Sequence, residues 1–371
     1  MEIIINRDIL LKSLGNAYGI IEKKTTLPIL SNILIEAKNS KVKITATDLD
    51  IIYSEKVKPI EIKKEGSTTT SATILYDILR KLEANSNVEL TLQGENKLKL
   101  ISRNSKFNLF CIASSNFPLL EEDIKQTTFE IASNKLLKLL NKTKISISSD
   151  ETRHYLNGIY LHKVVLADKT FICGVATDSH RLSSSSLEID SNVNIESIIL
   201  PKKTIFQLIS LLEQSVDNVE ISNDKSKIKF KINNSVLISK VIDGRFPDYS
   251  KVVPKDNDKT LQVKLNEFKN SVERVATVST DKKEGLKMLI SKENLQLSVN
   301  SPNSGEGTEN INAKFNSDEM SISFNSRYLI DIASQIENEF IAISLKDPGS
   351  PVLIKDLSDI NSFHVVMPMK I

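Results

Sequence analysis

The apolar positions of the chain repeat one pattern six times: a short strand followed by an amphipathic helix. The copies begin at positions 3, 67, 129, 197, 261 and 321, which gives spacings of 64, 62, 68, 64 and 60 residues. Within each predicted helix, apolar residues recur every three or four positions, as at Leu75, Ile78, Leu79 and Leu82 of the second copy. This spacing predicts an architecture of six repeated units.

A residue suited to starting a helix precedes each of these helices. In five copies it carries a side-chain oxygen that can accept a hydrogen bond from the first helical turn, namely Asn6, Ser71, Ser133, Asn266 and Asn325. The fourth copy has Pro201, whose fixed φ angle suits the first turn of a helix.

Segments of alternating apolar and polar residues follow the second helix of each pair and predict antiparallel strands. They pair as 87–93 with 98–104, 218–224 with 227–233, and 340–346 with 352–357. A helix combined with antiparallel strands is an α+β unit, and two units make one domain. We therefore predict three domains, at 1–125, 126–252 and 253–371.

Composition narrows the class of protein. Lys and Arg number 49 against 47 Asp and Glu, a net charge of +2, which argues against a strongly basic chain that coats phosphates. No apolar run is long enough to cross a membrane, and the N-terminus does not resemble a signal peptide. Cys111 and Cys173 lie in apolar, strand-like segments, so we expect buried thiols in a reducing cytoplasm.

Few residues suggest catalysis. Asp178, Ser179 and His180 supply the residue types of a hydrolase triad, but triad members converge from separate segments and these three are adjacent. The histidines lack metal-ligand spacing, and no glycine-rich phosphate-binding motif occurs. We predict no catalytic residue, metal or cofactor. The alternatives are an enzyme that acts on nucleic acid or a small substrate, and a monomeric peptide-binding scaffold.

The apolar C-terminal segment 365–371 allows two interpretations. An exposed Met-Pro-Met would suit an adaptable peptide-binding surface, whereas the same residues would also suit a final core strand.

Five segments together resemble the bacterial sliding clamp family, the β subunit of DNA polymerase III, in order and spacing over the whole chain. They are TLPILSNIL at 26–34, RHYLNGIYL at 153–161, GVATDSHRL at 174–182, IDGRFPDY at 242–249 and MPMKI at 367–371. The resemblance implies the DNA-clamp fold, in which two chains associate head to tail as a homodimer. Each chain would then form half of a pseudo-sixfold ring, with its helices lining the hole.

The same resemblance implies a non-catalytic processivity factor. It would encircle double-stranded DNA without sequence preference and tether the replicative polymerase. Its expected partners are the polymerase α subunit, the clamp loader δ subunit, and other polymerases and repair proteins that bind through short linear motifs. We expect a cytoplasmic protein with no membrane partner. Near-neutral charge fits a ring that holds DNA topologically rather than by a tight grip.

Three sets of site residues follow from the resemblance. A hydrophobic cleft for partner peptides would contain Arg153, Leu156, Thr177, Ser179, His180, Arg181, Leu182, Pro247, Val252, Asn325, Tyr328, Val365, Met367, Pro368 and Met369. The DNA-facing set is Lys24, His154, Tyr155, Lys202 and Lys203. The dimer interface would include Ile74, Leu75, Lys106, Thr277, Val278, Glu306 and Glu309, with Lys106 pairing with Glu306 or Glu309.

The sequence departs from the family pattern at several positions near the cleft. Ser179 stands where the family commonly has glycine, Lys283 where an apolar residue is frequent, and Lys370-Ile371 in place of Arg-Leu. These departures leave the ranking of partner peptides open.

Overall fold

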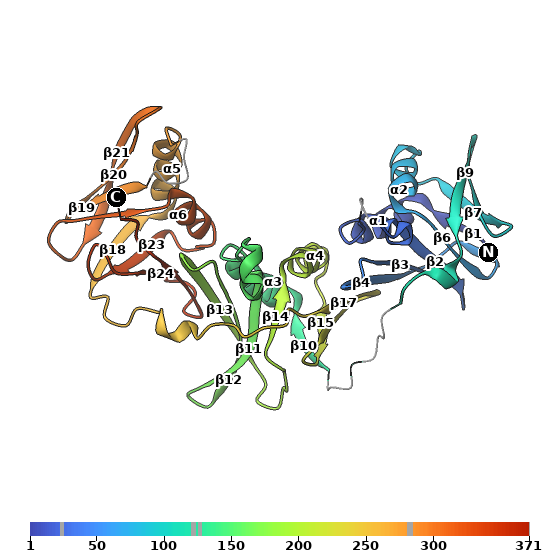
Figure 1. Cartoon of the computed structure of the whole chain (residues 1–371), viewed down its shortest axis with the longest axis horizontal. Helices are drawn as coiled ribbons and strands as arrows, with labels where there is room; N and C mark the ends of the chain where they lie inside the picture. The colour runs from blue at the N-terminus through green and yellow to red at the C-terminus, as the bar shows by residue number, and fades with distance from the viewer. Residues whose placement is uncertain (23–25, 120–123, 125–127, 280–284, 371) are drawn as a thin grey trace. The chain divides into compact units, whose positions relative to one another are not determined.

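The computed structural model describes residues 1–22, 26–119, 124, 128–279 and 285–370. In this part of the chain, six α-helices and two large antiparallel sheets are present (Figure 1). The helices are α1 (Arg7–Tyr18), α2 (Ala72–Lys81), α3 (Ser133–Lys144), α4 (Lys202–Leu212), α5 (Leu265–Ala276) and α6 (Ser326–Ala333). The predicted α+β class and the predicted helix in each repeat are confirmed.

The chain divides into two compact units. Unit 1 comprises Met1–Leu137, Val193–Glu196 and Lys203–Val241, and unit 2 comprises Lys138–Asn192, Ser197–Lys202 and Ile242–Ile371. Both units take residues from the 126–252 segment, since strands of that segment extend each sheet. The division into three domains therefore stays a prediction.

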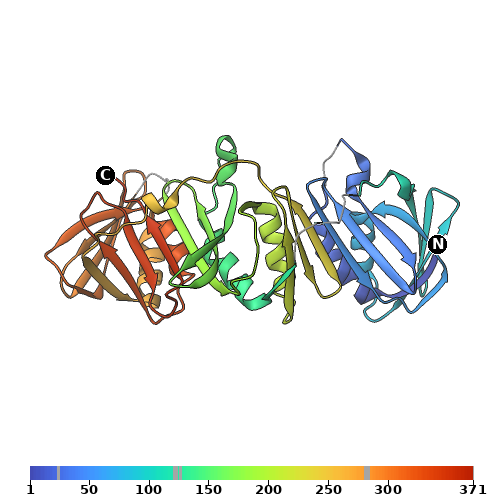
Figure 2. The same cartoon turned by 90° about the horizontal axis from the view of Figure 1, so that it is seen from below.

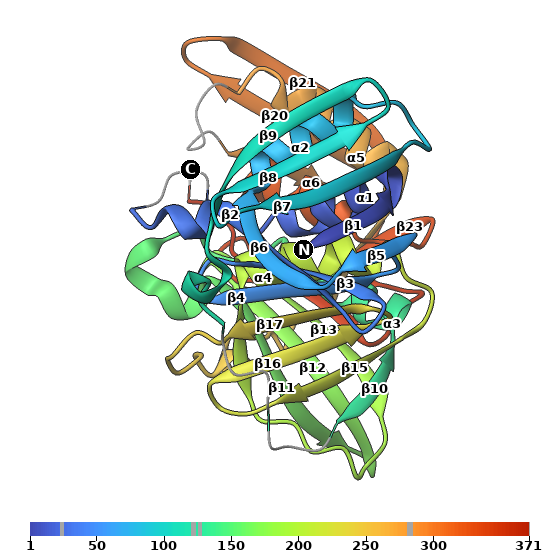
Figure 3. The ribbon, with the colours of Figure 1, turned by 90° about the vertical axis from the view of Figure 1, so that its right-hand side faces the viewer.

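Unit 1 is built on a 13-stranded sheet in the order β10-β15-β16-β17-β4-β3-β2-β6-β9-β8-β7-β1-β5. Its strands are β1 (Glu2–Asn6), β2 (Asn32–Lys38), β3 (Lys41–Thr47), β4 (Ile51–Val57), β5 (Glu61–Lys64), β6 (Gly66–Ser71), β7 (Asn87–Gln93), β8 (Lys97–Ser102), β9 (Ser105–Ile112), β10 (Phe129–Ala132), β15 (Asn218–Asn223), β16 (Lys227–Ile232) and β17 (Ser235–Lys240). The join between repeats is the β17–β4 ladder, which runs from Ser235 opposite Glu55 to Ser239 opposite Ile51. Figure 3 shows β7 and β8 in front of α2.

Unit 2 is built on a 12-stranded sheet in the order β14-β11-β12-β13-β25-β24-β23-β18-β21-β20-β19-β22. Its strands are β11 (Gly158–Leu166), β12 (Lys169–Thr177), β13 (Arg181–Ile189), β14 (Ile198–Pro201), β18 (Lys259–Lys264), β19 (Leu286–Ile290), β20 (Asn294–Ser301), β21 (Gly305–Phe315), β22 (Met320–Phe324), β23 (Phe340–Leu345), β24 (Val352–Asp356) and β25 (Ser362–Val366). Here the β13–β25 ladder joins segments far apart in sequence, and Figure 2 shows the green and red strands side by side.

The helix starts show why a strand can run directly into a helix. Asn6, Ser71 and Asn325 accept hydrogen bonds from the first turn of α1, α2 and α6, which confirms these three predicted caps. The cap predicted at Asn266 is wrong, because Asn266 lies inside α5. The Ser133 hydroxyl donates to the Asp217 carbonyl, and its role as a cap of α3 stays a prediction.

A neighbouring carbonyl takes over the capping role at these helices. The N–H of Leu265, the first residue of α5, donates to the Glu339 carbonyl over 2.8 Å. The N–H of Ser133, the first residue of α3, donates in the same way to the Asp217 carbonyl over 3.3 Å. In both cases the carbonyl belongs to the residue just before a strand, so the repeat itself satisfies an otherwise unpaired donor.

Burial of the repeats follows the apolar pattern. Leu75 and Leu79 of α2 and Phe268 and Val272 of α5 are fully buried. Both cysteines are buried free thiols, as expected, and burial raises the pKa of each. No helix in the described ranges is long and apolar enough to cross a membrane.

Candidate functional site

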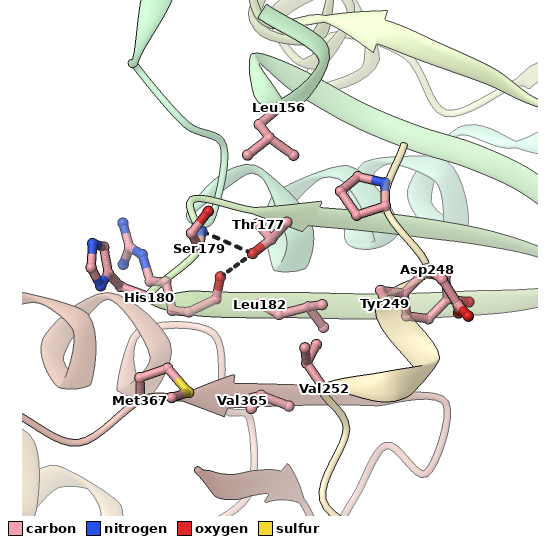
Figure 4. A pocket seen from close by; sticks show the side chains of 12 residues that line it. Leu156, Thr177, Ser179, His180, Leu182, Asp248, Tyr249, Val252, Val365 and Met367 are labelled. Atoms are coloured by element: carbon pink, nitrogen blue, oxygen red, sulfur yellow. Dashed lines mark hydrogen bonds between the residues drawn. The ribbon is translucent and has the colours of Figure 1, made fainter. Parts of the chain in front are cut away.

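A pocket of about 210 Å³ lies in unit 2 beside the β13–β25 ladder (Figure 4). Its surface is mainly apolar, and its lining residues come from four separate segments of the sequence: Leu156, Thr177, Ser179, His180, Arg181, Leu182, Pro247, Asp248, Tyr249, Val252, Val365 and Met367. All but Asp248 and Tyr249 belong to the cleft that the resemblance implies.

The floor of this cleft is set by strand register. Leu182 lies opposite Val365 in the β13–β25 ladder, and both side chains are buried. Leu156, at the end of the short 3-10 helix η3 (Glu151–Leu156), is buried beside them in one apolar cluster. At the rim, Val252 is 51% exposed and Met367 is 41% exposed. When another apolar group covers these exposed side chains and the apolar floor beneath them, apolar surface leaves water and the free energy falls.

A tight turn between β12 and β13 forms the polar side of the cleft. The Thr177 hydroxyl donates to the Arg181 carbonyl over 2.7 Å and accepts from the Ser179 N–H over 3.1 Å. Ser179 has a φ of 78°, the left-handed region that favours glycine. Its hydroxyl accepts a 2.5 Å hydrogen bond from Arg153, whose Nε also donates to Asp150.

The side chain of Arg181 is fixed by three partners. Its guanidinium donates to Asp178 over 3.1 Å and to Asp331 of α6 over 2.7 Å, and it lies 4.3 Å from the centre of the Tyr328 ring. Burial raises the pKa of Tyr328, and the nearby Asp178 carboxylate raises it further. These contacts tie the β12–β13 turn to α6 and leave Arg181 as a rigid part of the wall.

The sequence triad Asp178-Ser179-His180 has no catalytic geometry in the structure. The Asp178 carboxylate accepts hydrogen bonds from the backbone N–H groups of His180 and Arg181, each over 2.9 Å. It therefore shapes the turn and does not orient the His180 imidazole, as a triad carboxylate must. In the described residues, no group of three or more His, Cys, Asp and Glu side chains could hold a metal ion.

The C-terminal segment consists of a buried strand followed by a partly exposed tail, and the peptide-binding role of that tail stays a prediction. Residues through Val366 form the buried strand β25, and Met367 then emerges at the cleft rim. Backbone hydrogen bonds hold the tail on both sides: the Met367 N–H donates to His180 over 2.8 Å, and the Met369 N–H donates to Ser323 over 2.7 Å.

Several residues assigned to the cleft lie outside its lining. Arg153 and Tyr328 contact lining residues, as described above, and Asn325 is the N-cap of α6. Pro368 and Met369 follow Met367 along the tail. The two additional lining residues, Asp248 and Tyr249, belong to the distinctive IDGRFPDY segment. That motif was the signal available in the sequence, although it does not say which of its side chains face the cleft.

The residues assigned to DNA have varied environments. Lys24 lies outside the described residues. The Lys202 ammonium is exposed and donates to Ser149 over 3.1 Å. His154 Nε2 lies 3.2 Å from the Asp243 carbonyl, and its ring packs edge-on against Tyr155 with ring centres 5.9 Å apart.

Lys203 is committed to contacts within unit 1. Its ammonium lies 2.5 Å from Asp48 and 3.1 Å from Glu22, and it also donates to the Ile20 carbonyl. Burial by itself lowers the pKa of Lys203, but the hydrogen bonds and charges of Asp48 and Glu22 outweigh it and raise the pKa. Two carboxylates compensate its charge, so the structure favours a stabilising role over contact with phosphate.

The residues assigned to the dimer interface differ in how exposed their side chains are. Ile74 is 53% exposed, but its neighbour Leu75 is fully buried in unit 1, so Leu75 is a core residue and its side chain offers no surface contact. Glu309 is paired with Arg274 and Ser271 of its own chain, and Arg274 holds the pKa of Glu309 below its usual range. Lys106 and Glu306 are exposed, and Thr277 and Val278 follow α5.

Comparison with known proteins decides the family. Sequence models of the N-terminal, central and C-terminal domains of the DNA polymerase III beta subunit match residues 1–121, 130–248 and 250–370. The chain belongs to the DNA polymerase III β-subunit family. It is accordingly a sliding clamp, a processivity factor of DNA replication and not an enzyme, as the sequence led us to expect.

Relatives match along their full lengths. The beta sliding clamp of Caulobacter vibrioides is 35% identical over 374 residues, and that of Escherichia coli K12 is 30% identical over 371 residues, each with complete coverage of both chains. Among solved structures, a sliding clamp from Bartonella birtlesii bound to griselimycin is 38% identical, with a TM-score of 0.97 and complete coverage of both chains. A Caulobacter crescentus beta sliding clamp has the same TM-score at 35% identity, with coverage of 100% of this chain and 99% of that one.

Proposed function

We propose that the pocket beside β13 and β25 is the docking cleft for partner peptides of this clamp. The observation that carries the proposal is the apolar floor of Leu156, Leu182 and Val365, with exposed Val252 and Met367 at its rim. Such a groove accepts the leucine and aromatic anchors of an extended peptide. The related clamp bound to griselimycin supports a ligand-binding surface in this family.

The partners we propose share the use of short linear motifs. They are the α subunit of the replicative polymerase, the clamp loader δ subunit, and other polymerases and repair proteins. Because all of these partners would use the same cleft, they would compete for it. Tethering through the clamp raises the effective concentration of the polymerase at the primer end without any chemistry by the clamp.

We further propose that basic side chains on the helices contact DNA phosphates. Each helix carries one basic residue that has no carboxylate partner among the described residues: Lys12, Lys81, Lys135, Lys202, Lys269 and Arg327. Weak contacts of this kind are independent of sequence and permit sliding. Other basic residues, such as Lys142 and Arg274, are occupied by ion pairs.

The assembly we propose is a head-to-tail homodimer of three-domain chains that closes a ring around duplex DNA, in the cytoplasm. A head-to-tail contact uses different surfaces of the two partners, and it closes when rotation brings the second pair of surfaces together. Exposed Ile74 on α2 supports one of these surfaces, with Val278 and Thr277 on the other.

Truncation of the C-terminal tail tests the cleft assignment. Deletion from Val365 would remove part of buried β25, so the informative truncation begins at Met367. We expect the protein without residues 367–371 to remain a dimer in sedimentation but to lose binding to its replicative polymerase. Normal stimulation of that polymerase on primed circular DNA would contradict the cleft assignment, and a single-chain mass for the intact protein at micromolar concentration would contradict the ring.

A further inference from the structure

Two aromatic contacts hold one wall of the cleft, formed by residues 247–252, against strand β11. Phe246, just before this wall, is buried and stacks on Tyr160, with ring centres 5.0 Å apart and planes within 8°. Tyr249, within the wall, lies with its hydroxyl 3.0 Å from Nε2 of His162. Tyr160 and His162 are two positions apart on β11 and therefore lie on the same face of the strand, where their rings stack with centres 4.4 Å apart.

In the sequence, the residues of this wall that line the cleft lie between Phe246 and Tyr249 or shortly after Tyr249. Pro247 and Asp248 separate Phe246 from Tyr249, and Val252 follows three residues later. The regular structure of this wall is a single short 3-10 helix, η4 (Tyr249–Lys251). A wall with so little backbone hydrogen bonding takes its position from its side-chain contacts.

The hydrogen bond between His162 and Tyr249 is the specific part of this attachment. His162 is 9% exposed, and burial lowers the pKa of its imidazole, which keeps the ring neutral. Its other ring nitrogen, Nδ1, is buried without a hydrogen-bond partner in the described structure, so Tyr249 supplies the side-chain hydrogen bond of this ring. The Cys173 sulfur lies 3.9 Å from the same hydroxyl and is a much weaker partner.

We propose that His162 and Tyr249 are positioning residues of the peptide cleft, whose mutual hydrogen bond holds the 247–252 wall in its binding-competent place. This inference rests on the proposed function of the cleft. His162 acts through Tyr249 and does not line the pocket. If the bond is lost, the wall samples other positions, and the apparent affinity for a peptide falls in proportion to the fraction of time that the wall still spends in the binding-competent position.

The test compares substitutions that remove or keep this bond. The probe is a fluorescein-labelled extended peptide with one glutamine followed by leucine and phenylalanine anchors, and its dissociation constant is measured by anisotropy. Tyr249→Phe and His162→Leu should each weaken binding by about fivefold, as expected for one lost hydrogen bond. His162→Gln, which retains a hydrogen-bonding amide, should recover most of the affinity. Tyr160→Phe is the matched control: it removes a hydroxyl from the same cluster but keeps the stacked rings, and it should bind as the parent does.

A double substitution and a spectroscopic measurement separate positioning from general destabilisation. The double variant His162→Leu with Tyr249→Phe should bind no more weakly than either single variant, because both changes remove the same bond. The chain has 4 histidines, so their imidazole nitrogen resonances can be assigned individually. Tyr249→Phe should shift those of His162, and peptide addition should shift them in the parent protein.

The possible outcomes separate failure of the cleft assignment from failure of the positioning role of His162 and Tyr249. If the parent clamp fails to bind the peptide and also fails to bind griselimycin, the proposed cleft itself is wrong. If the parent binds and Tyr249→Phe binds equally well, or if the two substitutions weaken binding additively, the positioning role is overturned and the cleft assignment stands.

Discussion

Lys142 of α3 lies in a buried ion pair with Asp356 at the end of β24. Its ammonium is 3.3 Å from the Asp356 carboxylate and 2.9 Å from that of Asp359, and the side chains of Lys142 and Asp356 are 3% and 1% exposed. The hydroxyl of Ser362 accepts a third hydrogen bond from the same ammonium. Lys142 is therefore not a basic surface residue of α3. It joins α3 to the end of β24 inside unit 2.

Replacement of Lys142 by methionine tests this connection. The substitution keeps the aliphatic chain but leaves the buried Asp356 carboxylate without its cation, which typically costs about 3–5 kcal/mol of unfolding free energy. We expect a large drop in the midpoint of thermal unfolding. Lys169→Met is the matched control, because Lys169 is 61% exposed and its pairing with Glu188 should contribute about 0–1 kcal/mol. Equal effects of the two substitutions would contradict the structural role of Lys142.

The sequence predicted the fold well because each repeat carries its own signals. Apolar spacing located the six helices, and alternation located the strand pairs between 87 and 357. The ladders between β17 and β4 and between β13 and β25 were not predictable in this way. They join segments separated by well over a hundred residues, and a strand pattern indicates which face is buried but not which strand lies alongside.

The site was predictable mainly through resemblance to a family. Arg181 and Lys203 illustrate the limit of reasoning from residue type alone, since both looked available for ligands and both are engaged by carboxylates of distant segments. Tyr249 shows the converse case. In the sequence it is an ordinary aromatic residue, and only the fold brings His162 of β11 to its hydroxyl.

The fully buried His364 makes stability depend on pH. Its Nδ1 lies 2.8 Å from the Ser183 hydroxyl, its Nε2 has no partner in the described structure, and burial together with the charge of Lys142 lowers its pKa to about 3. The unfolded chain, with an ordinary pKa of 6.5, binds the proton first as the pH falls. This residue should therefore reduce the unfolding free energy between pH 6.5 and 3 by up to about 1.4 kcal/mol per pH unit.

Denaturant titrations at several pH values check the contribution of His364. In a His364→Gln variant, this part of the slope should disappear, although buried His162 contributes in the same direction and will remain. Asp356, whose pKa of about 2 is below its ordinary 3.8, adds its own loss of stability only at more acidic pH. An unchanged slope between pH 6.5 and 4.5 in the variant would show that His364 does not titrate as the structure requires.

Ser179 should be a position where glycine is tolerated or favourable. Its φ of 78° strains any residue that has a Cβ atom, so Ser179→Gly should change the unfolding free energy by less than about 1 kcal/mol. Ser179→Val should destabilise the protein measurably, because a β-branched side chain fits this backbone conformation poorly. Thermal unfolding of the two variants provides the comparison, and a valine variant as stable as the glycine variant would contradict the argument.

Charge reversal on the helices tests the proposed contacts with DNA. Lys135 of α3 is exposed and has no carboxylate partner among the described residues, whereas Lys203 is engaged by Asp48 and Glu22. Lys135→Glu should weaken retention of the clamp on circular DNA and reduce the salt dependence of binding by about one phosphate contact, without lowering thermal stability. Lys203→Met should do the opposite, because it leaves the buried Asp48 carboxylate unpaired: stability should fall while the salt dependence stays near that of the parent. If Lys203→Met instead changed the salt dependence and left unfolding unaffected, its ammonium would be a phosphate contact and the ion pair in unit 1 dispensable.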